Sequence, residues 1–200
     1  MGRKRIIERD AILDAAERVV VRDGAANLTL DAVAKEAGIS KAAVLYDTKT
    51  KQAVVEAVIE RAFDRDANLH ANAEAKIEGE NVAIRGRIAV ASEPPPQTFR
   101  PAALNLSAAL MLDERLRAQM QKHQAMTVAR IVETSSSPRG ALLAYLALEG
   151  LKFLEYLDFH HFTPGERSRV IEEIAWLLDA RPDLAARSDA TISGTQGGKS

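Results

Sequence analysis

The chain has 200 residues, of which 46% are hydrophobic, and it carries a formal net charge of −1. A chain of this length can form one or two small domains with a sizeable core, and the absence of cysteine excludes disulfides, thiolate metal sites and cysteine nucleophiles. The charged N-terminus has no apolar stretch after it, and the longest purely apolar run, residues 141–148, is too short to span a bilayer. We therefore expect a globular cytoplasmic protein.

Apolar residues recur at helical spacing, and long alternating runs typical of strands are missing, so the sequence predicts an all-α protein. The first expected helix covers residues 8–23, with Ile12, Ala15 and Val19 on one face. Gly24 is suited to end this helix, because glycine adopts the left-handed conformation without steric cost.

A positively charged arm precedes this helix, with Arg3, Lys4 and Arg5 as its basic residues. Such an arm can lie along a phosphate strand or enter a minor groove. The alternative is a solvated, frayed terminus. The sequence leaves both interpretations open.

Residues 28–51, LTLDAVAKEAGISKAAVLYDTKTK, predict two short helices joined by a tight turn. Thr29 is an N-cap residue for the first helix, and Gly38 can end it. Ser40 caps a second helix that runs to about residue 47, and Thr50 caps a longer third helix. This order is typical of a helix-turn-helix, whose second helix enters the major groove of DNA. An ordinary pair of packed helices is the alternative, because helical corners with glycine are common.

Small and polar residues in this stretch favour DNA binding over simple packing. Ala42 and Ala43 keep the second helix slim enough for a groove and can contact a thymine methyl, while Lys41 can donate to guanine. The donors suited to phosphates or to contacts at helix ends are Thr29, Ser40, Tyr46, Lys49, Thr50 and Lys51. With so few side chains to read bases, DNA shape should add to specificity.

The spaced residues of this region resemble the N-terminal domain of the TetR family of bacterial transcriptional regulators. The matching residues, in chain order, are Ile12-Leu13, Ala15-Ala16, Gly24, Thr29, Val33-Ala34, Ala37-Gly38-Ile39-Ser40, Leu45-Tyr46 and Lys51. The resemblance covers residues 8–63 and implies a homodimer that binds double-stranded DNA. It also implies that the helix after residue 51 connects the DNA-binding domain to a ligand domain, and that a small-molecule effector shifts this connector.

Two stretches depart from the family pattern. Family members usually have His-Phe after the tyrosine, where this chain has Asp47 and Thr48, and Ser-Lys-Glu where it has Thr50-Lys51-Gln52. The missing aromatic residue would normally pack inside the small domain, and Asp47 adds negative charge near the expected phosphate. We expect Asp47 to weaken DNA binding unless it turns away or pairs with Lys49 or Lys51.

The rest of the chain predicts a larger helical domain. A long helix is expected from residue 51 to about 77, a short one over residues 81–91, and a loop over residues 92–101, because three consecutive prolines cannot lie within a helix. Further helices are expected over residues 101–112, 113–133, 139–160 and 163–180, the last opened by a capping box of Thr163 and Glu166. The expected organisation is a three-helix DNA-binding domain at residues 1–50, a helical effector-binding and dimerisation domain at 51–181, and a disordered tail at 182–200.

The last two helices predict a dimer. Apolar residues cover nearly the whole circumference of the helix at residues 139–160, which is more than one chain can cover. Two-fold pairing with a second copy would form a four-helix bundle and supply two DNA half-sites. The expected interface residues are Leu142, Leu146, Leu154, Ile171, Ile174 and Leu178. Two core helices of a monomer are the alternative.

The family resemblance implies an effector among the middle helices. The candidate lining residues are Phe63, Leu104, Asn105, Met111, Met120, His123, Phe153 and Tyr156. Core packing is the alternative for each of them. Charged residues that could anchor an ionic ligand do not cluster in the sequence, so we expect an apolar or aromatic effector.

No catalytic or metal-binding motif stands out in the sequence. The adjacent His160 and His161 would point about 100° apart on a helix, which makes shared metal ligation awkward. We therefore expect no enzyme activity, no cofactor and no metal. The preferred interpretation is a repressor that a small molecule releases from a palindromic operator. A DNA-binding protein without an effector, and a helical ligand- or partner-binding module that has lost DNA binding, are the alternatives.

Overall fold

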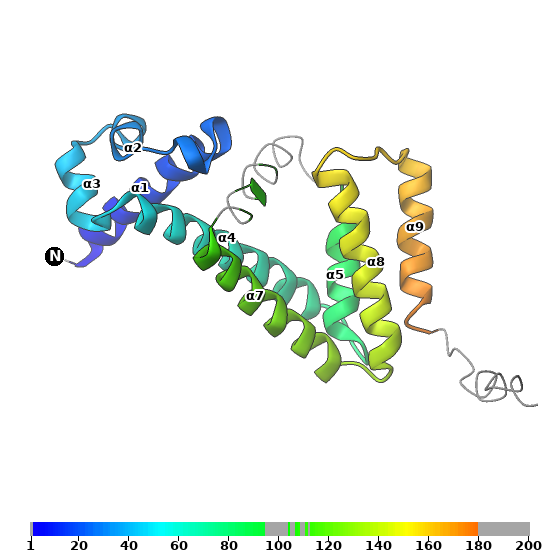
Figure 1. Cartoon of the computed structure of the whole chain (residues 1–200). Helices are drawn as coiled ribbons and strands as arrows, with labels where there is room; N and C mark the ends of the chain where they lie inside the picture. Colours follow the sequence, from blue (N-terminus) through cyan, green and yellow to red (C-terminus); the bar gives the residue numbers. More distant parts are fainter. Residues whose placement is uncertain (1, 95–103, 105–106, 109–110, 112, 180–200) are drawn as a thin grey trace, which may run out of the picture.

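A computed structural model describes residues 2–94, 104, 107–108, 111 and 113–179, with side chains from residue 9 onward. This part of the chain forms eight α-helices and one short 3-10 helix, η1. Two groups of helices are joined by the long helices α4 and α7, which lie side by side (Figure 1). The expected all-α class is confirmed.

The N-terminal group consists of α1 (Gly2–Asp23), η1 (Ala25–Asn27), α2 (Leu30–Ala37), α3 (Lys41–Thr48) and the first part of α4 (Lys51–Glu74). Its core is aliphatic, with Val19, Leu28, Val33, Val44 and Val54 fully buried. The residues of the expected basic arm continue α1 as helix, so α1 begins earlier than the sequence indicates. The core extends past residue 50 into α4, because Val54, Val55, Val58 and Ile59 all contribute to it.

The C-terminal group consists of α5 (Val82–Ser92), α7 (Glu114–Glu133), α8 (Pro138–Tyr156) and α9 (Pro164–Trp176). Its separate core contains Ile84, Ile131, Leu148, Ile171 and Ile174. In Figure 1, α5, α8 and α9 stand next to one another, and α9 is outermost. The described part of the chain thus folds around two cores.

Several helix ends follow directly from the sequence. Thr163 and Glu166 form the expected capping box at the start of α9, and Asp113 caps α7 by accepting from two backbone N–H groups at 2.9 and 3.1 Å. α4 ends at Glu74 and α8 at Tyr156, each a few residues before the expected position. Propensity alone places such ends only to within a few residues.

A close approach between α8 and the chain after α9 depends on Gly140. A Cβ atom at this position would lie 2.5 Å from the carbonyl oxygen of Leu177. No side chain larger than hydrogen fits at that distance, so glycine is what allows the start of α8 and the end of α9 to pack together.

Some expected elements lie outside the described residues. These are the loop beyond residue 94, most of the helix expected over residues 101–112, and the tail at residues 182–200. Within the described ranges, no helix is both long and apolar enough to cross a membrane.

Candidate nucleic-acid interface

α2 and α3 meet at the tight turn that the sequence predicts. Gly38 ends α2 with φ 69° and ψ 27°, the left-handed conformation expected of glycine at this position. The hydroxyls of Thr29, Ser40 and Thr50 accept hydrogen bonds from the backbone N–H groups three residues on, at 3.1, 3.2 and 3.0 Å. All three hydroxyls therefore act as N-caps, at helix ends whose remaining N–H groups are suited to phosphate.

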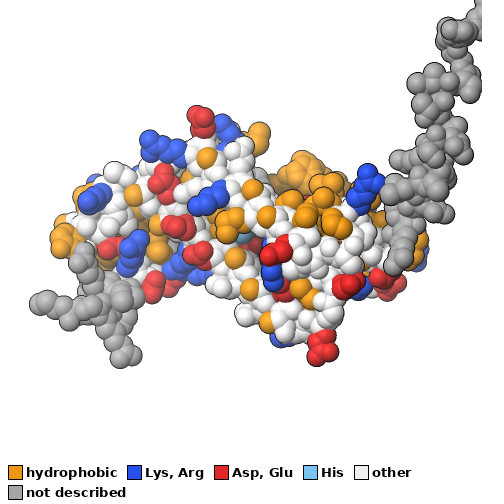
Figure 2. Space-filling view, turned by 90° about the horizontal axis from the view of Figure 1, so that it is seen from below, with side chains coloured by type: hydrophobic (Ala, Val, Ile, Leu, Met, Phe, Trp, Pro, Cys, Tyr) orange, Lys and Arg blue, Asp and Glu red, His pale blue; other side chains and the backbone are white. Residues whose placement is uncertain are grey.

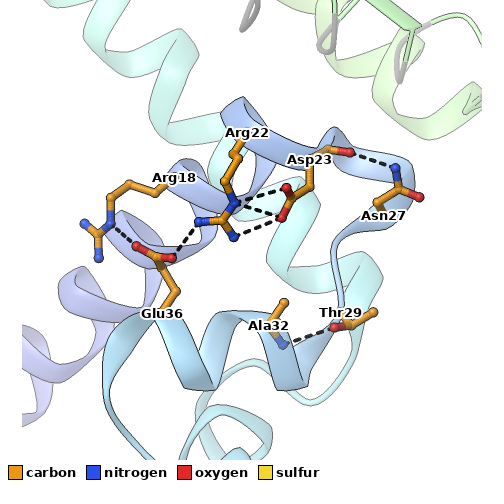
Figure 3. Close-up of polar contacts among 7 residues, drawn as sticks. All are labelled: Arg18, Arg22, Asp23, Asn27, Thr29, Ala32 and Glu36. Carbon is orange, nitrogen blue, oxygen red and sulfur yellow. Dashed lines mark hydrogen bonds and ion pairs between the residues drawn. The ribbon is translucent and has the colours of Figure 1, made fainter.

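Ion pairs hold α2 against α1 (Figure 3). The carboxylate of Glu36 accepts from Nε of Arg18 at 2.8 Å and from Nη1 of Arg22 at 2.9 Å. These two hydrogen bonds lower the pKa of Glu36. Nearby, Nδ2 of Asn27 donates to the carbonyl oxygen of Asp23 at 2.8 Å. Exposed pairs stabilise a fold only slightly, so this set adds to the packing of α2 on α1 that the buried Val33 and Ala34 provide.

One face of α3 is exposed and carries residues that the sequence assigns to DNA. Ala42 and Ala43 are exposed, and Tyr46 exposes 76% of its surface, whereas Val44 is fully buried on the opposite side. A slim helix face with a phenolic hydroxyl at its edge suits entry into a major groove.

The three lysines around α3 have different surroundings. Nζ of Lys41 lies 2.7 Å from the carboxylate of Asp31, which links α3 to α2. Nζ of Lys51 donates to the carbonyl oxygen of Ala26 at 2.6 Å, which links α4 to η1. Lys49 is exposed and has φ 59°, a value uncommon outside glycine. A phosphate contact by Lys51 would have to compete with its hydrogen bond to Ala26. The sequence does not indicate this hydrogen bond.

Asp47 and Thr48, the first of the two departures from the family pattern, turn inward. Asp47 is half-buried, and its Oδ2 is fully buried with no hydrogen-bond partner among the described residues. The hydroxyl of Thr48 donates to the carbonyl oxygen of Val44 at 2.8 Å. One carboxylate oxygen of Asp47 is thus turned away from the exposed face of α3, at a cost in desolvation.

The basic residues Arg3, Lys4 and Arg5 lie in the first turns of α1. Their side chains are outside the described part of the chain. Their contact with DNA stays a prediction.

The residues expected to line an effector pocket have varied surroundings. Leu104, Met111 and Phe153 are exposed, Phe63, Met120, His123 and Tyr156 are half-buried, and Asn105 lies outside the described residues. The rings of Phe63 and His123 stack, with centroids 4.8 Å apart and planes 14° apart. This stack links α4 to α7 through two residues of the expected set.

A polar cluster that the sequence does not indicate lies next to this stack. The two carboxylate oxygens of Asp66 lie 3.4 Å from Nε2 of His70 and 3.4 Å from Nε2 of His123. In α5, Nη2 of Arg87 donates to the hydroxyl of Thr127 at 3.1 Å. The expectation that charged residues do not cluster is therefore wrong, because α4, α5 and α7 bring together residues far apart in the chain.

Charge keeps Asp66 ionised inside this cluster. Burial alone would raise its pKa, but the hydrogen bond from His70 and the charges of His70, Arg87 and Lys152 outweigh burial and lower the pKa to about 2. On α8, burial raises the pKa of Tyr145 to about 12, and its hydroxyl donates to the side-chain oxygen of Gln124. Asp66 and His70 are four residues apart on α4, a spacing that could have indicated their contact.

The predicted dimer residues divide into two sets. Ile171, Ile174 and Leu178 are buried in the core of their own protomer, so their assignment to the dimer surface is wrong. They face inward because α9 packs its apolar stripe on α5 and α8. Leu146 and Leu154 on α8 are 65% and 37% exposed, as an interface residue must be in one protomer. Leu142 is half-buried.

The two histidines after α8 contact different residues. The ring of His160 packs edge-on against Phe162 at 4.4 Å, and Nε2 of His161 lies 3.3 Å from Asp158. Both lie in the connection between α8 and α9.

The capped turn, the exposed face of α3 and the second helical core define a class of protein: helix-turn-helix DNA-binding proteins with a helical C-terminal domain. The family model of the bacterial regulatory proteins of the tetR family matches residues 12–58. The model of the tetracyclin repressor-like C-terminal domain matches residues 83–179. Together the two matches cover most of the chain.

Solved structures show the same fold. A transcriptional regulator from Streptomyces coelicolor A3(2) superposes with a TM-score of 0.71 at 15% identity, over 86% of this chain and 99% of that one. A TetR-family regulator from Rhodococcus sp. gives 0.64 at 22% identity, over 86% and 98%. The multidrug binding protein EbrR, complexed with malachite green, gives 0.67 at 22% identity, over 84% and 96%. No curated protein matches the chain.

The chain therefore belongs to the TetR family of bacterial regulatory proteins. It is a DNA-binding transcriptional regulator.

Proposed function

We propose that this regulator is a homodimeric repressor that binds a palindromic operator and leaves it when a small molecule binds to the C-terminal domain. The exposed face of α3 carries the proposal. Ala42, Ala43 and Tyr46 lie on a helix that is capped by Ser40 and held in the core of the domain by the buried Val44. A rigid support of this kind is what a base-reading helix requires.

An exposed apolar stripe on α8 supports pairing with a second copy. Leu143, Leu146 and Phe153 are 53%, 65% and 54% exposed, at spacings that place them on one side of the helix. On α9, Trp176 is 61% exposed. Figure 2 shows a group of hydrophobic side chains on the C-terminal half, with charged side chains of both signs around it. Contiguous apolar surface of this kind marks an interface, and a two-fold pair would present two α3 helices.

The effector is proposed to be an aromatic molecule that also carries a hydrogen-bond donor. The stacked rings of Phe63 and His123 offer an aromatic surface, and the ionised Asp66 beside them accepts hydrogen bonds. EbrR, which shares the fold, has been solved with malachite green and with ethidium. The sequence favours an apolar or aromatic effector. The acceptor in the polar cluster adds the expectation that this effector carries a hydrogen-bond donor.

Selection from random duplex DNA tests the DNA-binding part. The purified protein is mixed with a random library at moderate salt, and the retained DNA is sequenced. A two-fold symmetric motif is expected, with half-sites about one helical turn apart. Lack of enrichment by folded, dimeric protein would contradict the proposal and favour a ligand- or partner-binding module.

A matched pair of variants shows whether α3 is the reading element. Ala43→Glu places a carboxylate on the exposed face of α3, and Ala89→Glu places one on the exposed side of α5. Ala43 lies in the first turn of α3, where the helix dipole favours a carboxylate, and Ala89 is exposed, so both variants are expected to fold. Ala43→Glu should abolish enrichment, whereas Ala89→Glu should retain the motif.

A further inference from the structure

α7 contributes to the core of the DNA-binding domain although it belongs to the C-terminal half of the chain. Leu116, in its first turn, is 2% exposed and packs among the core residues of α1 and α4. One residue before the helix, Oδ2 of Asp113 accepts a hydrogen bond from Nε2 of Gln52 at 2.8 Å. Gln52 lies in the first turn of α4 and also donates to Glu56 at 3.2 Å. The start of α7 is thus docked to the DNA-binding domain by one apolar and one polar contact.

The same helix follows α4 along its length and enters the C-terminal core near its end. In the middle, His123 stacks on Phe63 and contacts Asp66. Near the end, Nε of Arg130 donates to Glu74 at 3.0 Å, and Ile131 is fully buried in the second core. Figure 1 shows α7 running beside α4 from one group of helices to the other. α7 is therefore a second link between the two cores, next to the covalent link made by α4.

We infer that α7 positions the DNA-binding domain, with Leu116, Asp113 and Gln52 as the docking residues, and that the direction of α3 is set by α7 as well as by α4. If α4 were the only link, bending or twisting of α4 would move the DNA-binding domain relative to the C-terminal domain. Two helices held side by side restrict both motions. The polar cluster lies midway along both helices, so a ligand there acts on the pair rather than on α4 alone.

The consequence for DNA rests on the proposed function. Inserting one base pair between two half-sites rotates one of them by about 35° and moves it by about 3.4 Å. A dimer with fixed domains should discriminate strongly between the selected operator and the operator with the insertion. A dimer with loosened domains should adapt to both, so the ratio of the two affinities should fall toward one.

The first test measures this ratio for docking variants. Gln52→Ala removes the hydrogen bond to Asp113 and is expected to lower the ratio by a factor of roughly 2 to 10, the contribution of one hydrogen bond. Leu116→Ala should lower it further. A ratio equal to that of the unchanged protein in both variants would overturn the inference.

Matched controls separate docking from general loss of stability. Gln121→Ala makes the same substitution on an exposed position of α7, and Leu148→Ala removes the same side chain from the C-terminal core, where it is 1% exposed. Lower stability reduces the amount of folded protein, so it lowers the apparent affinity for both operators equally. The controls should therefore keep the ratio, and a ratio lowered as much by Leu148→Ala as by Leu116→Ala would refute a docking role.

A second test needs no DNA, so it stands even if the proposed function fails. The chain has no cysteine, so Lys35→Cys on α2 and Ala89→Cys on α5 give two defined spin-label sites. Labelled chain is mixed with excess unlabelled chain, and the distance distribution is measured by pulsed electron resonance. A narrow distribution that broadens in Gln52→Ala and Leu116→Ala, but not in the two controls, supports the inference. Equal widths in all five proteins would contradict it.

Discussion

Arg167 and Glu155 form an ion pair that is buried between α9 and α8. Nε of Arg167 lies 2.8 Å from Oε1 of Glu155, and both residues are more than nine-tenths buried. The guanidinium also donates to the carbonyl oxygen of Ser92 at 3.3 Å, at the end of α5. Three helices of the C-terminal domain therefore meet at one pair of charges.

Removing one partner of this pair should be costly. Arg167→Met leaves the carboxylate of Glu155 buried without its cation, and we expect a loss of roughly 3–5 kcal/mol in the free energy of unfolding. The double variant Arg167→Met, Glu155→Leu should recover most of the loss, because neither charge is then buried. Urea unfolding measures both values. Arg169→Met, at an exposed position of α9, is the control and should change little; a single variant as stable as this control would show the pair to be unimportant.

Asp66 predicts how stability depends on pH. Its pKa in the folded state is about 2, below the value of about 3.9 in an unfolded chain. The folded state therefore binds the proton less readily, and Asp66 stabilises the fold above about pH 4 and loses this contribution as the pH falls toward 2. The side chain is 40% exposed, so we expect a contribution of only about 1 kcal/mol.

The variant Asp66→Asn isolates this contribution. At pH 7 the variant should be less stable than the unchanged protein in urea unfolding, and the difference should shrink between pH 4 and pH 2.5. A difference that stays constant over this range would mean that the carboxylate does not titrate as its surroundings indicate.

The ion pair between Asp31 and Lys41 should restrain DNA binding. Asp31→Asn leaves the shape of the side chain and releases the ammonium of Lys41, while it removes one negative charge near α3. We expect the affinity for the selected operator to rise by a factor of about 2 to 5 at low salt, with a smaller gain at high salt. Fluorescence anisotropy at several salt concentrations measures it. Asp64→Asn removes the same charge from α4 and is the control. Weaker binding by Asp31→Asn would show that Asp31 does not compete with DNA phosphate for Lys41.

Tyr46 and Lys49 should contribute to binding in different ways. Lys49→Ala removes a cation, so it should lower the salt slope of binding by about one and weaken all DNA sequences about equally. Tyr46→Phe removes a neutral hydroxyl, so it should weaken binding by a factor of roughly 2 to 10 with the slope unchanged. An unchanged slope in Lys49→Ala would remove that lysine from the phosphate contacts.

The two sets of apolar residues in α8 and α9 should respond differently to a charge. Leu146→Glu places a carboxylate on the exposed stripe, and we expect a folded monomer. Ile174→Glu places one in the protomer core, where the residue is 4% exposed, and we expect loss of folding. Light scattering gives the oligomeric state and circular dichroism the helix content. A dimer that survives Leu146→Glu would place the interface elsewhere.

The sequence predicts best what is local. The turn at Gly38 and the caps at Thr29, Ser40 and Thr163 are as expected, because each depends on residues within one helical turn. The all-α class follows for the same reason. Leu116 shows where local reasoning ends, since nothing near it in the chain indicates that it completes the core of another domain.

Apolar periodicity also does not say which partner covers a stripe. Ile171 and Leu146 both lie on apolar stripes of neighbouring helices, yet one is buried within the protomer and the other is 65% exposed. Clusters of charged residues from different helices likewise cannot be seen in the sequence. His123 reaches Asp66 only because α7 lies along α4, and a pattern read along one helix cannot include that contact.

Gly140 limits which helices can be exchanged between this regulator and its relatives. Any side chain at this position would push the end of α9 away from α8. The start of α8 and the end of α9 would then lose their close packing. A chimera that imports α8 from another regulator must therefore import a residue without a Cβ at this point, or bring its own α9 with it.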